Sequence, residues 1–496
     1  MRKLFYNSNV EVTMTKHLNV TPDWVKNAVF YQIFPDRFAW SSKVEKPSNF
    51  ETWDSPPTVH GFKGGDLVGV LEKLDYLEDL GITAIYFNPI FQSASNHRYH
   101  THDYYQVDPL LGGNDAFKTL VEEAHKRGIK VVLDGVFNHA SRGFFQFNHI
   151  LETGKDSPYV DWFHIFGYPL HAYEGKPNYA CWWDLPALPK LNTDNPQVRK
   201  YILDVAKYWI EQGADGWRLD VPFEIDDDDF WREFRDVVKT ANPEAYIVGE
   251  IPSEAQRWMA GDQFDAVMNY QITQAALGFF GGKQIDFALA SGMMGLGEAK
   301  RYTAEYFAKR TEELLQIYPY EFALAQMNLL DSHDMPRFLS LVSGNVKRLY
   351  LAYLFLFTYP GAPTIYYGDE IGLTGGRDPE CRKSFPWDEG EWNTDLRGKI
   401  KALVHLRNHK AALRTGAYKV IYAHDGVLAY IRQNDEETVL IVLNANETPQ
   451  TLTIPTADYF KVGTKLQSQL SDHAFVVTEN GLEDLKLNCL SGIILA

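Results

Sequence analysis

Short apolar runs alternate with longer segments of helical periodicity along most of the chain. The longer segments repeat apolar residues every three or four positions, as in residues 198–213 and 345–357, and predict helices. The short runs are rich in β-branched and aromatic residues and predict eight strands, at residues 28–34, 82–88, 129–136, 216–221, 245–251, 265–270, 323–330 and 363–370. Eight strands, each followed by a helix, are typical of a parallel (β/α)8 TIM barrel, in the α/β class. A doubly wound open sheet gives a similar pattern, but the sequence lacks the glycine-rich dinucleotide fingerprint of such sheets.

Two regions depart from this alternation. Residues 140–193 form a long insertion after the third strand that is rich in aromatic residues, proline and glycine. From about residue 416 the pattern changes to short alternating runs, which predict a separate C-terminal all-β sandwich domain. The predicted organisation is an N-terminal extension, a barrel in two parts, an inserted B domain and the C-terminal β domain, at residues 1–23, 24–139 with 194–415, 140–193 and 416–496.

Charged residues occupy the ends of several predicted strands. In the fourth strand, "GWRLD", Arg218 and Asp220 share one face, although charged side chains are rarely buried unless they are paired or functional. Further acidic residues and a histidine follow the third, fifth and seventh strands: Asp134, Glu250, His333 and Asp334. Because the carboxyl ends of barrel strands meet at one mouth, the sequence predicts that these side chains form one site.

The residue types at these positions favour cleavage of a glycosidic bond. The sequence has no Cys/His metal spacing, nucleophile elbow or phosphate loop, which leaves carboxylates as the reactive groups. A retaining glycosidase needs one ionised and one protonated carboxyl about 5–5.5 Å apart, and neighbouring strands lie about 4.8 Å apart. Arg218 is expected to lower the pKa of Asp220, whereas Glu250 follows an apolar run and its pKa is expected to rise. A purely structural Arg218–Asp220 ion pair is the alternative.

Composition restricts the partners and the location. The chain has 496 residues and a formal net charge of −17, which argues against nucleic acid or an anionic membrane as a partner. Its three widely spaced cysteines predict neither a disulfide framework nor a metal site and fit a reducing compartment. We expect no signal peptide, and the longest apolar run, residues 349–359, is too short to cross a bilayer. A cytoplasmic protein is predicted.

Seven motifs in order resemble those of the α-amylase superfamily, glycoside hydrolase family 13. Four are similar to its conserved regions: "DGVFNH" (134–139), "GWRLD" (216–220), "GEI" (249–251) and "DSHD" (331–334). "LPKLN" (188–192) resembles the signature of the cyclomaltodextrinase, neopullulanase and maltogenic amylase branch, and residues 91–109 and 375–382 also match. The resemblance extends from about Trp24 to the C-terminus.

This resemblance implies roles for individual residues. Asp220 would be the nucleophile, Glu250 the general acid/base, and Asp334 the carboxylate that grips and distorts the sugar. The implied substrate-binding residues are Tyr99, His139, Arg218, Glu224, His333, Asp378 and Arg382. The implied reaction is retaining hydrolysis of α-1,4-glucosidic bonds in cyclodextrins and maltooligosaccharides, with starch and pullulan as further substrates to test. Alternatives are a glucanotransferase, a general α-amylase and a catalytically silent glucan-binding subunit.

The sequence also departs from the branch in three places. Pro252 stands where relatives usually have Trp, and Phe223 stands where they commonly have Asn, which leaves α-1,6 cleavage and transglycosylation open. Only about twenty residues precede the barrel, so we do not expect the dimer that relatives build through an N-terminal domain, and the oligomeric state stays open. Residues 39–49, where relatives often bind calcium, offer few oxygen ligands, so no metal and no required cofactor is predicted.

Overall fold

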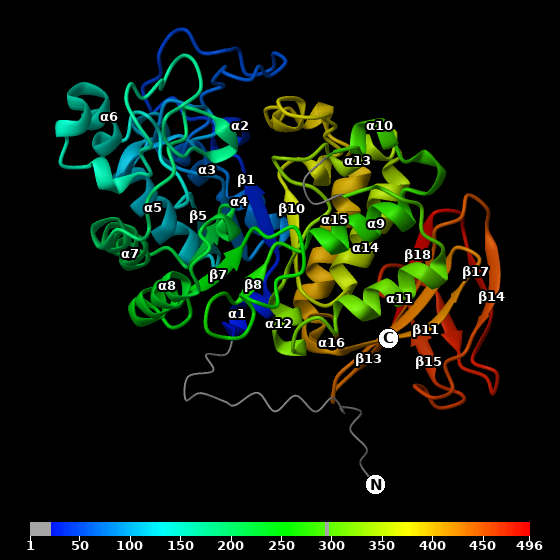
Figure 1. Cartoon of the computed structure of the whole chain (residues 1–496). Coiled ribbons are helices and arrows are strands. Elements are labelled where there is room, and N and C mark those ends of the chain that lie inside the picture. Colours follow the sequence, from blue (N-terminus) through cyan, green and yellow to red (C-terminus); the bar gives the residue numbers. More distant parts are fainter. Residues whose placement is uncertain (1–20, 293–296) are drawn as a thin grey trace.

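Eight parallel strands form the central sheet of the protein (Figure 1). The computed structural model describes residues 21–292 and 297–496, so most of the predicted N-terminal extension lies outside the described residues. The strands are β1 (Phe30–Ile33), β2 (Ala84–Phe87), β5 (Lys130–Gly135), β6 (Gly216–Leu219), β7 (Tyr246–Gly249), β8 (Ala266–Val267), β9 (Met327–Asn328) and β10 (Ala362–Tyr366). Their order is β8-β7-β6-β5-β2-β1-β10-β9, and a parallel bridge between Met268 and Met327 joins the two outer strands. The predicted (β/α)8 barrel is therefore confirmed.

Each of the eight barrel strands is shorter than predicted, and the seventh differs most from its predicted range. Residues 323–325 belong to helix α12 (Tyr320–Ala325), and β9 contains two residues only. A short buried apolar run can be a helix or a strand, and periodicity alone does not distinguish them. The Val267 backbone N–H of β8 donates a hydrogen bond to the Gln326 side chain (3.2 Å). This bond takes the place of a backbone hydrogen bond between β8 and a longer β9.

Helices surround the barrel, and the side chain of the preceding residue caps several of them. Asn195 caps α7 by accepting from the Gln197 backbone, and Asp227 caps α8 by accepting from the Phe230 backbone. The longer helices are α5 (Gly113–Lys126), α7 (Pro196–Glu211), α8 (Asp228–Ala241), α9 (Tyr270–Phe280), α11 (Ala304–Leu314), α14 (Val346–Thr358) and α15 (Thr394–His409). Across the described residues, every helix is too short or too polar to pass through a lipid bilayer.

The insertion begins and ends beside the residues that follow β5. It contains one longer helix, α6 (Phe145–Thr153), and returns to the barrel where Lys190 forms a β-bridge with His139. A hairpin that the sequence pattern did not predict, β3 (Phe91–Ser93) with β4 (Thr101–Val107), lies before it in the chain. In Figure 1 the insertion and the C-terminal strands lie on opposite sides of the barrel.

The C-terminal region is an all-β unit that shares its core with the barrel. Its main sheet contains β11 (Ala417–His424), β12 (Val427–Gln433), β13 (Thr438–Asn444) and β18 (Ser491–Leu495), and two further strand pairs are β14 (Gln450–Ile454) with β17 (Leu482–Leu487) and β15 (Lys465–Gln467) with β16 (Ala474–Val476). Leu428 and Tyr430 of β12 belong to the barrel core, whereas Ala429 and Ile431 belong to a second core between the sheets. Alternate residues thus bury both faces of this strand.

Candidate active site

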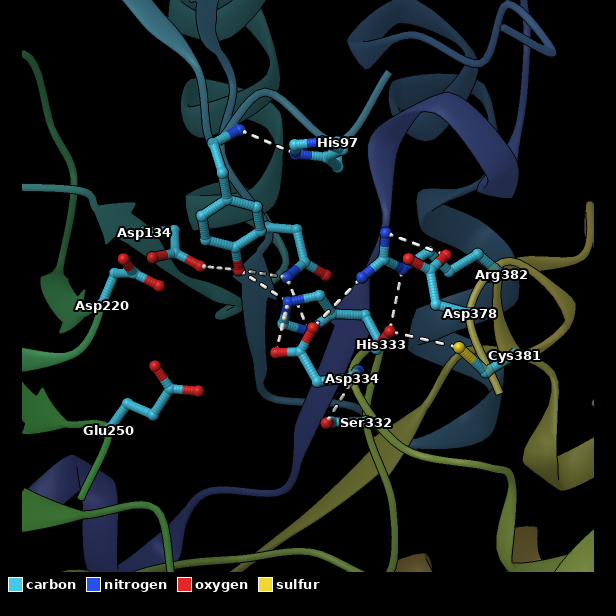
Figure 2. A network of polar contacts seen from close by, with 12 residues as sticks. His97, Asp134, Asp220, Glu250, Ser332, His333, Asp334, Asp378, Cys381 and Arg382 are labelled. Atoms are coloured by element: carbon cyan, nitrogen blue, oxygen red, sulfur yellow. Dashed lines mark hydrogen bonds and ion pairs between the residues drawn. The ribbon is translucent and has the colours of Figure 1, made fainter. Parts of the chain in front are cut away.

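Three carboxylates lie at the carboxyl ends of the barrel strands. Asp220 directly follows β6, Glu250 directly follows β7, and Asp334 lies in the loop after β9. Leu219 pairs with Gly249 in the parallel ladder, so Asp220 and Glu250 occupy equivalent positions on neighbouring strands. Figure 2 shows the three side chains pointing toward a common space. The structure therefore brings together the three residues that the sequence predicted to be catalytic.

Arg218 contacts three of the acidic side chains. Its Nη1 lies 3.0 Å from Asp134 Oδ1 and 3.2 Å from Asp220 Oδ1, and its Nη2 lies 2.6 Å from Glu250 Oε1. The sequence analysis predicted a cation beside Asp220, and the structure shows that Arg218 also contacts Glu250, for which the sequence indicated no obvious cationic partner. The reason is that Arg218 pairs in register with Asp134 on one side and Val248 on the other, so its guanidinium reaches both neighbouring strands.

The pKa values of the two central carboxyls are both raised. Burial, followed by the nearby Glu250 carboxylate, raises the pKa of Asp220 well above its usual range, and Arg218 opposes this. Burial also raises the pKa of Glu250, with Arg218 and a backbone N–H opposing. The expected rise for Glu250 is confirmed and the expected fall for Asp220 is wrong, because one guanidinium is shared among three buried carboxylates. Two acids in one buried site titrate as a pair, which favours one charged and one protonated group.

Two donors fix the carboxylate of Glu250 in addition to Arg218. The Val221 backbone N–H donates to Oε2 (3.1 Å), and the Tyr270 hydroxyl donates to Oε1 (3.2 Å). Val221 has a φ of 35°, which a β-branched residue rarely adopts, and this turn directs its N–H toward Glu250. The sequence analysis did not single out Tyr270, although the residue ends the sixth predicted strand, where the rule used for the other strand ends applies.

Asp334 is held by His333 and Arg382. Its Oδ2 lies 3.0 Å from His333 Nε2, and its Oδ1 lies 3.1 Å from Arg382 Nη2 (Figure 2). Arg382 Nη1 also lies 3.2 Å from Asp378 Oδ1. Burial by itself would raise the pKa of Asp334, but His333 and Arg382 outweigh it and lower the pKa below its usual range. Asp334 is therefore the carboxylate that stays ionised.

Tyr99 and His333 form one wall of the site. Their rings stack with centroids 5.4 Å apart and planes 6° from parallel. The Tyr99 hydroxyl donates to Asp134 Oδ2 (2.8 Å) and lies 2.7 Å from His333 Nε2. These contacts place the ring of Tyr99 at the site, as the family resemblance implied.

His139 and Glu224 lie at the border with the insertion. His139 is buried, and burial lowers its pKa to about 3. Among the described residues, its Nε2 has no hydrogen-bond partner. A buried polar atom of this kind is available to a ligand. Glu224 lies outside the network of Arg218, where its backbone carbonyl accepts from Lys190 Nζ (2.6 Å) and its carboxylate lies 3.6 Å from the same ammonium.

The residues that would surround a calcium ion in relatives do not fit one here. Within residues 39–49, Lys46 directs its Nζ to Asp66 Oδ2 (2.7 Å) and to the Leu110 carbonyl (3.0 Å). An ammonium group therefore occupies oxygen atoms that could otherwise bind a metal ion. Over the part of the chain that the structure describes, no group of three or more His, Cys, Asp or Glu side chains could hold a metal.

Comparison with known proteins agrees with this geometry. The family model "Alpha amylase, catalytic domain" matches residues 32–405, and "Neopullulanase-like, C-terminal domain" matches residues 418–492. The chain belongs to the α-amylase family of glycoside hydrolases. The resemblance of its sequence motifs to this family is thereby confirmed.

Relatives and solved structures cover most of the chain. A cyclomaltodextrinase from Bacillus sp is 46% identical over 435 residues, which are 87% of this chain and 75% of the relative. The crystal structure of Ttha1563 from Thermus thermophilus is 51% identical with a TM-score of 0.92, over 95% of this chain and 99% of the other. A debranching enzyme from Nostoc punctiforme is 47% identical with a TM-score of 0.87, over 96% and 99%.

Proposed function

We propose that this family member hydrolyses α-1,4-glucosidic bonds in cyclodextrins and maltooligosaccharides with retention of configuration. The single observation that supports this most is the placement of Asp220 and Glu250 at register-equivalent ends of neighbouring strands, in contact with one guanidinium. Adjacent strands separate such residues by about 4.8 Å, near the 5–5.5 Å of a retaining pair. The name of the cyclomaltodextrinase relative supports the substrate class.

The reaction would proceed in two steps. Asp220 attacks the anomeric carbon while Glu250 donates its proton to the leaving oxygen, which gives a covalent glycosyl-enzyme and a free sugar end. Glu250, now ionised, takes a proton from water, and the resulting hydroxide displaces Asp220. Because the pKa values of both acids are raised, the pair keeps the proton that the first step needs.

The surrounding residues would hold the sugar whose bond breaks. Asp334, kept ionised by His333 and Arg382, would accept hydrogen bonds from sugar hydroxyls. The Tyr99 ring would pack against the apolar face of the pyranose. His139 Nε2, which is buried and has no hydrogen-bond partner in residues 21–292 and 297–496, would bond a further hydroxyl. These assignments extend the roles that the family resemblance implies.

Initial rates on four substrates test the proposal. β-Cyclodextrin, maltoheptaose, soluble starch and pullulan are incubated in parallel with the wild-type protein and with Asp220→Asn. We expect the highest rates on the first two, with products of the α configuration by NMR and no turnover by the variant. A β-configured product, or full activity of Asp220→Asn, would refute the mechanism.

Two related activities use the same carboxylates. A glucanotransferase differs only in the acceptor, which is a sugar instead of water. If incubation with a high concentration of maltotriose gave mainly longer oligosaccharides, the main reaction would be transfer and not hydrolysis. Cleavage of α-1,6 bonds is a second candidate, favoured by the similarity to the debranching enzyme from Nostoc punctiforme. In the four-substrate comparison, a rate on pullulan above that on maltoheptaose would favour it.

We also propose that the protein needs no calcium at residues 39–49 and functions in the cytoplasm. The Lys46 ammonium binds the Asp66 carboxylate and the Leu110 carbonyl, so a positive charge of the protein lies where a calcium ion would otherwise contact these oxygen atoms. The three cysteines, Cys181, Cys381 and Cys489, are all free, which fits a reducing compartment.

A further inference from the structure

Three aromatic rings stack outward from the active site toward solvent. The imidazole of His139 stacks on Trp182 with ring centroids 5.3 Å apart and planes at 22°. Trp182 stacks in turn on Trp183 with centroids 4.4 Å apart and planes at 8°. His139 is buried, whereas Trp183 is 70% exposed. Since one face of the Trp183 indole covers Trp182, the other face is open to solvent.

The backbone holds Trp183 in an unfavourable conformation. Its φ is 51°, and that of the next residue, Asp184, is 57°. Positive φ is rare for a bulky side chain, and such strain persists where the surrounding structure enforces it, which is often a ligand-binding position. The strained turn keeps a large apolar side chain in water instead of in the core.

A hairpin of the insertion ties this turn to the active site. The Lys190 backbone N–H donates to the Ala180 carbonyl (2.9 Å), and the Trp182 N–H donates to the Leu188 carbonyl (3.0 Å). At the base of this hairpin, Lys190 forms a β-bridge with His139 and donates through Nζ to the Glu224 carbonyl (2.6 Å). The position of Trp183 is therefore fixed relative to two residues of the site.

Trp183 differs from the three other aromatic side chains of the insertion that are more than 60% exposed. Phe166, in the same insertion, is 74% exposed. The guanidinium of Arg142 lies over the ring of Tyr173, 4.4 Å from the ring centroid. Phe145 packs against His149 and Tyr159, both within the insertion. Trp183 is connected through continuous ring stacking to a histidine of the active site, which makes it the one best placed to contact substrate.

We propose that the open face of Trp183 binds a glucose unit of the α-glucan, outside the position where the bond is broken. One face of a pyranose ring consists of C–H groups and packs on a flat aromatic surface, as rings do in aromatic pairs. This inference rests on the proposed function and adds a binding position to it. Substrates long enough to reach both His139 and Trp183 would gain affinity that shorter ones do not.

The test compares substrates of different length in matched variants. Values of kcat/KM for maltotriose and maltoheptaose are measured for the wild type, Trp183→Ala, Trp183→Tyr and Phe166→Ala. In Trp183→Ala we expect the maltoheptaose-to-maltotriose ratio to fall about tenfold, as loss of one aromatic stack predicts. Trp183→Tyr should restore most of the ratio, and Phe166→Ala should leave it at the wild-type value.

The outcomes separate this inference from the proposed function. If the wild type cleaves no α-glucan, the proposed function is wrong. If it cleaves them and Trp183→Ala keeps the wild-type ratio, or Phe166→Ala lowers it equally, only the binding position at Trp183 is wrong. Calorimetry gives an independent measurement in folded protein. It compares the binding of maltoheptaose to the Asp220→Asn variant and to the double variant Asp220→Asn, Trp183→Leu. About tenfold weaker binding is expected in the double variant, and unchanged binding overturns the inference.

Discussion

Arg218 lies closer to Glu250 than to Asp220: its Nη2 is 2.6 Å from Glu250 Oε1, whereas its Nη1 is 3.2 Å from Asp220 Oδ1. The cation therefore supports the charged form of both acids and is not dedicated to the nucleophile. Since burial still raises both pKa values, the pair retains a proton at a higher pH than isolated carboxyls would. The pH dependence of the enzyme is therefore set by the pair of acids together and not by either residue alone.

Replacing Asp220 or Glu250 should in each case abolish turnover, but for different chemical reasons. Asp220→Asn cannot form the glycosyl-enzyme, so we expect kcat to fall by about 10³-fold or more on every substrate. Glu250→Gln loses the general acid, which is worth about 10²–10⁴-fold. Because a fluoride leaving group needs little protonation, Glu250→Gln should keep far more of its kcat/KM, which reports the first step, on α-maltosyl fluoride than on maltoheptaose. Equal losses on the two substrates would contradict the role of Glu250.

The same Asp220→Asn variant should be more stable than the wild type at neutral pH. The pKa of Asp220 is raised in the folded state, so its ionised form destabilises the fold at pH above the unfolded value of about 3.9. We expect a gain of about 1 kcal/mol in the free energy of unfolding at pH 7. The gain should shrink as the pH falls through the raised pKa, and urea unfolding at several pH values measures it. A gain independent of pH would contradict this explanation.

Tyr270 should set the alkaline limit of activity. Its hydroxyl donates to Glu250 Oε1 (3.2 Å) and so favours the carboxylate. In Tyr270→Phe the pKa of Glu250 should rise, and the alkaline limb of the kcat/KM profile should move to higher pH because the acid stays protonated longer. Tyr246→Phe is the matched control, since its hydroxyl donates to the Ala325 carbonyl inside the barrel. An unmoved limb in Tyr270→Phe would contradict the prediction.

Thermal unfolding should be insensitive to calcium and sensitive to Lys46. The Lys46 side chain is 17% exposed in its ion pair with the fully buried Asp66, so Lys46→Met leaves a buried carboxylate unpaired. We expect this to lower the free energy of unfolding by about 3 kcal/mol. Lys43→Met removes a pair with Glu72 in which Lys43 is 72% exposed, and should change stability by less than about 1 kcal/mol.

EDTA and added calcium should both leave the Tm of the wild type unchanged. A fall in Tm with EDTA that calcium reverses would show that a metal ion stabilises the fold, and would overturn the proposal for Lys46.

Phe223 should influence the choice of acceptor and linkage. It lies in the turn that follows Asp220, next to Glu224, on the side that the family resemblance assigns to the leaving group. We expect Phe223→Asn to raise the ratio of transfer to hydrolysis or the rate on pullulan, because a polar side chain can bind an incoming sugar hydroxyl. Chromatography of products from concentrated maltotriose and from pullulan measures both. Unchanged product profiles would show that Phe223 has no such role.

The number of barrel strands and the charged residues near their carboxyl ends were predictable because they depend on local pattern. The apolar run that ends in Glu250 and the motif around Arg218 each lie within a few residues of sequence. The hairpin β3–β4 and the helical start of residues 323–330 were not predictable, since the first is too polar for a strand signal and the second is apolar in either conformation. Tyr270 was missed because the search of the strand ends considered charged residues, and its contact with Glu250, twenty positions away in the chain, arises only in the fold.

The sequence by itself determined the barrel and the set of acidic residues near its strand ends, because hydrophobic periodicity and residue type are local properties, and the motif resemblance selected three of these acids as the expected catalytic residues. Only the tertiary structure decided which acid Arg218 pairs with most closely, that Asp220 is protonated more readily than an isolated acid, and that the Lys46 ammonium lies among buried oxygen atoms. Distances and burial set the electrostatic energy between charges. Both arise from contacts between residues far apart in the chain, which no local pattern encodes.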